Sequence, residues 1–260
     1  MTHSVAPDRD VKTAPQRQIY ERAPILETII EIRVSPSAPA DLDSLRAVRT
    51  GDENRYPEEL AVMESAVGVE VTGLVASMTS APTKQTGYQW QNRAGAEIFR
   101  ASSTQLSYHK LRPYTRWELC RDEARRLWEK YQRIVRPQTV ERLGLRYINR
   151  LDLPPSGDLN DYLLTTPQIA PGIHQELSSY MMTLTLPQPD LPNTTITLRQ
   201  ATVEAPSPDV ASVVFDIDVS RTMPTSPASD QIWSAFERLH ERQNQIFELC
   251  ITDRTRGLIS

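Results

Sequence analysis

The stretch from residue 140 to residue 154 constrains the fold more than any other part of this 260-residue chain. Between residues 142 and 151, leucine and tyrosine stand at odd positions and arginine stands at even positions. Successive side chains point to opposite faces of a β-strand, so this alternation predicts one long, half-buried strand. The face expected to lie on a hydrophobic core carries Leu143, Leu145, Tyr147 and Leu151.

The opposite face of this strand would carry Arg142, Arg146 and Arg150. One interpretation is structural, because arginines on a strand pair with carboxylates on neighbouring strands. The other is functional, because a guanidinium can hold a phosphate or a carboxylate through parallel hydrogen bonds. Asn149 falls on the leucine face, where it either ends the buried segment or makes a buried hydrogen bond.

Composition and charge restrict the classes of partner. Hydrophobic residues make up 39% of the chain and charged residues 24%, which is ordinary for a soluble protein. The net charge of −4 disfavours nucleic acid as a partner, although a local basic strip stays open. No apolar run is long enough to span a membrane, and the N-terminus lacks the apolar stretch of a signal peptide. We therefore expect a cytoplasmic protein with no membrane contact.

The sequence contains no familiar catalytic or metal-binding motif. Cys120 and Cys250 are far apart and fit no zinc-site spacing, so we expect both to be core residues. No phosphate-binding glycine loop and no nucleophile elbow occurs. We predict no catalytic residue, no metal site and no cofactor. Asp216 and Asp218 share one strand face, where they would hold a divalent cation or, as we favour, pair with the arginines.

The order of predicted elements repeats once along the chain. Each half holds a strand, a short helix, a three-stranded antiparallel meander and a long helix. The first repeat spans residues 20–136 and the second spans 137–260, after a flexible N-terminal arm at 1–19. Self-similarity at such a long period indicates duplicated units. The predicted fold class is α+β, with two halves that share a pseudo-two-fold sheet or a barrel-like core.

The spacing of aromatic residues supports the duplication. Trp117 and Trp233 stand near the starts of the two predicted long helices, 116 positions apart (233 − 117). The same difference separates Tyr131 from Phe247 and Phe99 from Phe215. In a sheet built from two such halves, the faces away from the helices would line a central groove. The candidate binding residues of this groove are Arg142, Arg146, Arg150, Glu31, Arg33, Asp216 and Asp218.

Both long helices show an apolar stripe at helical spacing. The first is expected over residues 115–135, where Thr115 and Glu118 have the spacing of a capping box. Its stripe predicts that Trp117 and Trp128 are buried against the sheet. The second is expected over residues 229–250, and Gln243 is a polar interruption of its core face.

Several strings resemble a sporadically distributed family of bacterial proteins of about this length. They are Pro24-Ile-Leu-Glu27, Tyr114-Thr-Arg-Trp-Glu118, Arg142 to Arg150, His240 with Phe247-Glu248, and Ile251-Thr-Asp253. The resemblance covers most of the chain from Tyr20 onward, and Gly-Leu-Arg-Tyr-Ile-Asn-Arg is its most specific part. It implies no established activity or cofactor. The patchy occurrence of the family is typical of mobile genes, such as those of defence or toxin–antitoxin systems.

The opening strand also resembles, in part, that of the triphosphate-tunnel enzymes, which carries Glu-x-Glu-x-Lys. Glu31 and Arg33 keep the alternation, but Ile29 stands in place of a carboxylate and arginine replaces the lysine.

Three functions follow from the sequence. The leading expectation is a non-catalytic binding or assembly protein with a protein partner or self-association. The first alternative is a phosphate- or nucleotide-binding protein, or a phosphohydrolase, in which the groove of arginines and carboxylates holds an anionic small molecule. The second alternative is a nucleic-acid-binding protein.

Overall fold

The computed structural model describes residues 20–64, 67–72, 75–80, 83–155 and 157–260. The predicted N-terminal arm lies outside these residues. The helices are α1 (Leu42–Arg46), α2 (Trp117–Val135), α3 (Gln231–Cys250) and α4 (Asp253–Ile259), with short 3-10 turns at Ala47–Arg49 and Leu159–Asp161. Within the described ranges, none of the helices has the length and apolar character needed to cross a membrane.

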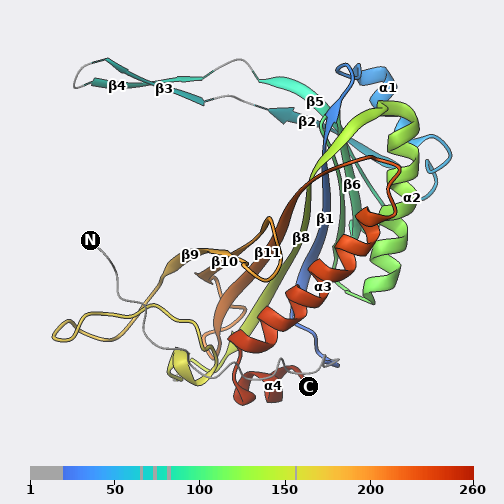
Figure 1. The fold of residues 1–260 in the computed structure, drawn as a ribbon. Helices are drawn as coiled ribbons and strands as arrows, with labels where there is room; N and C mark the ends of the chain where they lie inside the picture. The colour runs from blue at the N-terminus through green and yellow to red at the C-terminus, as the bar shows by residue number, and fades with distance from the viewer. Residues whose placement is uncertain (1–19, 65–66, 73–74, 81–82, 156) are drawn as a thin grey trace.

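The remaining elements are strands. They are β1 (Ile25–Pro36), β2 (Glu58–Glu64), β3 (Val67–Thr72), β4 (Val75–Ser80), β5 (Lys84–Gln91), β6 (Glu97–Ser102), β7 (Gln105–Leu111), β8 (Pro137–Leu153), β9 (Met181–Pro187), β10 (Thr194–Val203) and β11 (Ala211–Thr225). Nine of them form one antiparallel sheet in the order β2-β5-β6-β7-β1-β8-β11-β10-β9, while β3 and β4 form a separate hairpin (Figure 1). The α+β class and the antiparallel sheet are confirmed.

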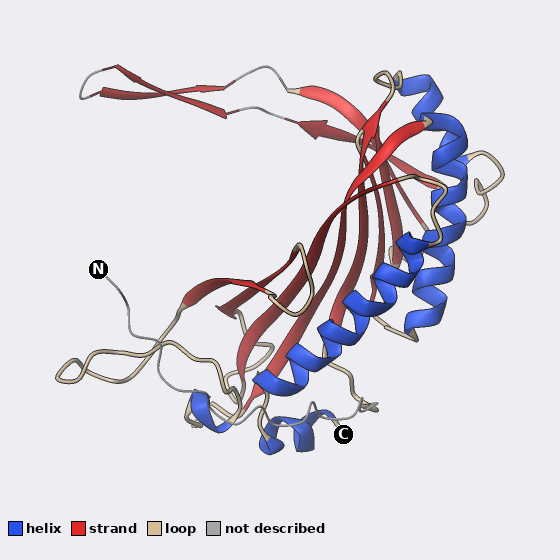
Figure 2. Ribbon diagram, viewed as in Figure 1, coloured by secondary structure: helices blue, strands red, loops and turns tan. Residues whose placement is uncertain are grey.

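The sheet is open, so the expectation of a barrel-like core is wrong. Its edge strands, β2 and β9, stand at opposite ends of the strand order. Figure 2 shows α2 and α3 together on one face of the sheet. The two helices contact each other, because the guanidinium of Arg121 donates a 2.7 Å hydrogen bond to Glu237. The helix pair buries that face of the sheet, which therefore needs no closure to form a core.

The strand order runs outward in the same way on both sides of the central pair. β1 is followed by β7, β6 and β5, and β8 is followed by β11, β10 and β9. The offset of 116 does not hold on the strands, because Phe99 lies on β6 and Phe215 lies on β11, which occupies a different place relative to its central strand. The internal duplication and the pseudo-two-fold symmetry stay predictions.

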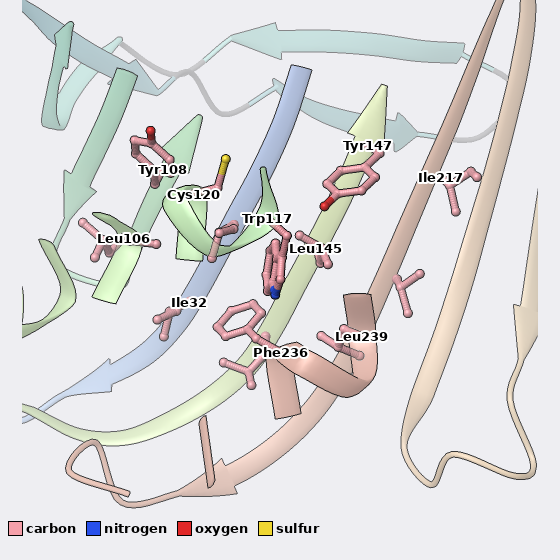
Figure 3. Packing of buried hydrophobic residues seen from close by; sticks show 14 of the residues in the cluster. Ile32, Leu106, Tyr108, Trp117, Cys120, Leu145, Tyr147, Ile217, Phe236 and Leu239 are labelled. Carbon is pink, nitrogen blue, oxygen red and sulfur yellow. The ribbon is translucent and has the colours of Figure 1, made fainter. Parts of the chain in front are cut away.

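The alternation on β8 is confirmed. Leu143, Leu145, Tyr147 and Leu151 are buried on the helix-covered face. Figure 3 shows Leu145 and Tyr147 on that face, close to Trp117 of α2 and to α3. Trp117 and Trp128 are also buried, as the helical stripe predicted, and so are Cys120 and Cys250.

One local expectation is wrong. Helix α2 begins at Trp117, and its N-cap residue Arg116 makes no side-chain capping bond. Thr115 therefore lies one residue too early to cap the helix. Strand β2 holds apolar residues at positions 60–63 between glutamates, and it pairs with β5.

Candidate functional site

The face of β8 that points away from the helices carries the predicted arginines. Arg146 donates to Asp216 of β11 through two hydrogen bonds, 2.8 Å from Nε to Oδ1 and 2.6 Å from Nη2 to Oδ2. The Asp216 side chain is 4% exposed and also accepts from Arg199 at 3.3 Å. Hydrogen bonding to Asp216 raises the pKa of Arg146 above its ordinary value. This buried carboxylate is thus held by more than one guanidinium.

A second group of charges joins β1 to β8. Glu31 accepts from Arg142 at 2.5 Å and from Arg33 at 2.8 Å. Arg142 also lies 3.8 Å from Asp218, and burial raises the pKa of that carboxyl despite the nearby arginines. Gly144 makes room for this group, since a Cβ at this position would lie 3.1 Å from Nη1 of Arg142.

Arg150 stands apart from both groups. It donates to Asp152 at 2.8 Å and to the hydroxyl of Ser212 at 3.0 Å. The structure therefore places all of the predicted binding residues on one face, and each of them has an oppositely charged neighbour. This geometry agrees with the structural interpretation of the arginines, and their binding role stays a prediction.

On the same face, three hydrogen-bonded side chains stand in the serine–histidine–carboxylate order of a nucleophilic triad. The hydroxyl of Ser107 lies 2.9 Å from Nε2 of His109, whose Nδ1 lies 2.7 Å from Glu27. This bond to His109 lowers the pKa of Glu27. Ser107 is 2% exposed, however, and it does not line the cavity described next. Sequence reasoning missed this chain because it depends on the pairing of β1 with β7.

A cavity of about 980 Å³ opens on the opposite, helix-covered side of the sheet. Its walls come from the segment before β1 (residues 20–25), the segment at the start of α2 (residues 112–118), β8 and α3. The volume lies at the upper end of the usual range for small-molecule sites. The residues contributed by β8 and α3 are Tyr147, Asn149, His240, Gln243, Asn244, Phe247 and Glu248.

A polar chain crosses this cavity wall. The hydroxyl of Tyr147 lies 3.2 Å from that of Tyr114 and 3.0 Å from Nδ1 of His240. The other ring nitrogen of His240 lies 3.2 Å from the amide of Asn244. The imidazole also stacks on Trp117, with ring centroids 4.5 Å apart and an angle of 11° between the planes. These contacts fix the ring and give the wall a flat aromatic surface.

Gln243 is the exceptional residue of the cavity. It is 1% exposed, and neither Nε2 nor Oε1 of its carboxamide has a hydrogen-bond partner among the described residues. Burial of an unpaired polar group costs free energy, so such a group in a folded protein calls for an explanation. Thr28 and Arg221 also have unpaired polar atoms, but neither lines the cavity. The polar interruption in the apolar face of the helix was the signal for this site.

The cavity lining carries charges of both signs, from Glu21, Arg22, Arg112, Arg116, Glu118 and Glu248. Arg112 donates to the backbone carbonyls of Ile25 at 3.2 Å and Pro24 at 3.3 Å, and its charge also acts on the carboxylate of Asp152. Arg116 stands at the uncapped start of α2, where backbone N–H groups and the helix dipole favour anions. Within the cavity, Glu248 is already compensated by Arg256 at 3.0 Å.

Four of the five strings quoted for the resemblance contribute residues to this cavity, and residues 251–253 do not. Pro24 and Ile25, the run from Tyr114 to Glu118, Tyr147 with Asn149, and His240 with Phe247 and Glu248 all contribute to its walls. These strings are dispersed over the sequence, so their convergence becomes visible only in the folded chain.

The sequence matches no protein-family model and no curated protein. In the described part of the chain, no group of three or more histidine, cysteine, aspartate or glutamate side chains is placed to hold a metal ion.

Proposed function

We propose that the chain is a non-catalytic binding protein that holds a small organic molecule in the helix-side cavity. The observation that carries the proposal is the buried carboxamide of Gln243, which borders the cavity without a hydrogen-bond partner among the described residues. A ligand that bonds to this amide would compensate the cost of burying it. Aromatic walls with a few polar groups are typical of such sites.

The charged face of β8 supports a structural role more than a binding role. The buried Asp216 already accepts two hydrogen bonds from Arg146 and one from Arg199. Glu31 accepts hydrogen bonds from Arg33 and Arg142. An anion bound there would compete with these carboxylates for the same donors. We therefore place the binding site on the other side of the sheet.

A fluorescent apolar probe, anilinonaphthalene sulfonate, tests whether the cavity accepts a ligand. We expect a saturable increase in its fluorescence with the wild-type chain. Thr115→Trp puts a bulky ring at an exposed position of the cavity wall and should suppress that increase. Glu129→Trp, at an exposed position further along α2, is the matched control and should not. No saturable signal, or the same signal in all three proteins, would contradict the proposal.

The outward strand order also supports the finer proposal that the two halves are duplicated units. In an experimentally determined structure, residues 20–135 should superpose on residues 138–252, with α2 on α3 and β1 on β8. Different helix placement after superposition of the central strands would overturn it.

A further inference from the structure

The cavity has a chemical character that restricts its ligand. Gln243 offers a donor, Nε2, beside an acceptor, Oε1, and both lack a partner within the described residues. A carboxamide of this kind forms a pair of hydrogen bonds with a planar group that presents an acceptor beside a donor. Nucleobase edges have this pattern, and glutamine reads adenine in this way. Both polar atoms of the amide are buried, so a base could be read only after a rotamer change that exposes the amide to the cavity.

The surfaces around Gln243 suit a flat ring. Tyr147 and the stacked pair of Trp117 and His240 line the same cavity, and Phe247 adds another aromatic face. Stacking of a base on aromatic side chains is favourable for every base, because each base has a π-face. The hydrogen bonds would therefore select the base, and the stacking would supply much of the affinity.

The cavity offers donors to an anionic substituent, although Glu21, Glu118 and Glu248 also line it. Arg112 and Arg116 line it, and neither is paired with a carboxylate among the contacts of the described residues. The backbone N–H groups at the start of α2 receive no side-chain cap. A phosphate attached to the base through a ribose would reach toward these donors, and the cavity volume of about 980 Å³ accommodates a mononucleotide.

We propose that the cavity binds a nucleobase, carried by a nucleoside or a mononucleotide, with Gln243 reading the edge of the base. This inference rests on the proposed function and names the ligand class of the same site. The nucleoside and the nucleotide share the base chemistry, and they differ in whether Arg116 and the start of α2 take part.

The test uses the full chain and thermal unfolding with the four common ribonucleosides, their monophosphates, inorganic phosphate and ribose 5-phosphate. At about 100-fold excess over Kd, a bound ligand should raise Tm by roughly 5 °C. Gln243→Leu has a similar volume and cannot form the hydrogen bonds, so it should weaken binding of the preferred base by about tenfold or more. Gln138→Leu, at an exposed position of β8, is the matched control and should bind as the wild type does.

The comparison of each nucleoside with its monophosphate shows which of the two is the ligand. If the natural ligand is a nucleotide, Arg116→Ala should weaken the monophosphate about threefold to tenfold and leave the nucleoside unchanged. Arg133→Ala, at the other end of α2, is the control for the lost charge and should change neither. Equal binding of nucleoside and monophosphate would identify the nucleoside as the ligand.

Three outcomes would overturn the inference. Ribose 5-phosphate and inorganic phosphate are expected to shift Tm less than the nucleotides do, and equal shifts would show a phosphate site without base recognition. Undiminished binding by Gln243→Leu would show that the amide does not contact the ligand. No nucleoside or nucleotide effect, together with saturable probe fluorescence that Thr115→Trp suppresses, would reject the nucleobase while the binding cavity stands. Loss of both signals would reject the proposed function as well.

Discussion

The two faces of β8 differ in whether the polar side chains around them have partners. On one face, Arg142, Arg146 and Arg150 all have carboxylate partners. On the other face, Tyr147 and Asn149 border a cavity beside Gln243, whose carboxamide has no partner among the described residues. The difference teaches that abundance of charge is a weak guide to a binding site. A buried polar group that the fold leaves unsatisfied is the stronger indication.

The largest expected effect concerns the wall of the cavity. Trp117→Ala should lower the free energy of unfolding by about 3–5 kcal/mol, because a buried indole leaves a cavity and its packing on His240 is lost. Denaturant unfolding measures the change. Leu119→Ala, at an exposed position on the same helix, should stay within about 0.5 kcal/mol of the wild type. A cost below about 1 kcal/mol for Trp117→Ala would show that this wall is not part of the core.

A smaller loss is expected on the charged face. Arg146→Ala should cost about 2 kcal/mol, because it leaves the carboxylate of Asp216 buried with Arg199 as a weaker partner. The value lies below that of a fully buried pair because the Arg146 side chain is 37% exposed and solvent screens its charge.

Anion titrations decide between structure and binding for this face. If the charged face is structural, phosphate, pyrophosphate and a nucleotide should change the Tm of the wild type and of Arg146→Ala by the same amount. An anion-dependent rise confined to the wild type would break the comparison, because the charged face would then be the binding site.

Gln243→Leu should increase the stability of the protein, unlike Trp117→Ala and Arg146→Ala. Removal of an unpaired buried amide in favour of an apolar side chain of similar volume should raise the free energy of unfolding by about 1 kcal/mol. Urea unfolding of the ligand-free protein measures it. A loss of stability would mean that the amide has partners in solution, and the contrast between the faces would weaken.

The smallest effect is a dependence on pH. The bond to His109 lowers the pKa of Glu27 in the folded state, so the folded pKa lies below the unfolded value of about 4.3. The stabilisation from Glu27 is therefore complete above the unfolded pKa and is lost as pH falls through the folded pKa.

Glu27→Gln should cost about 0.5–1 kcal/mol at pH 7 and make the decline of stability in acid less steep. Unfolding curves recorded from pH 7 to pH 3 measure both. An unchanged acid slope would show that the hydrogen bond does not persist in solution.

Local patterns made the central strands and the long helices predictable. The alternation around Leu145 and the stripe through Trp117 each concern residues that are neighbours within one element. Strand β2 escaped prediction because its apolar residues, at positions 60–63, show no alternation, and it pairs with the distant strand β5. Thr115 and Glu118 have the spacing of a capping box, but the helix begins one residue later than this box requires.

The candidate site was predictable only in fragments. Gln243 stood out as a polar residue on an apolar helix face, and Asn149 stood out on the leucine face of its strand. Nothing in the sequence shows that these residues share a cavity with Tyr114, because that requires α3 to pack over β8. The pairing of Arg146 with Asp216 could be anticipated, since charges on neighbouring strands compensate each other.

The central pairing of β1 with β8 has a consequence for how the chain folds. Ile30 faces Leu145 across this pair, 115 positions away in the sequence (145 − 30). Contacts between such distant residues slow folding, because the loop must close before the pairing is gained. A chain cut between α2 and β8 would expose a long hydrophobic strand edge in each fragment, and such edges promote aggregation. The halves are therefore expected to fold together and to fail as separate fragments.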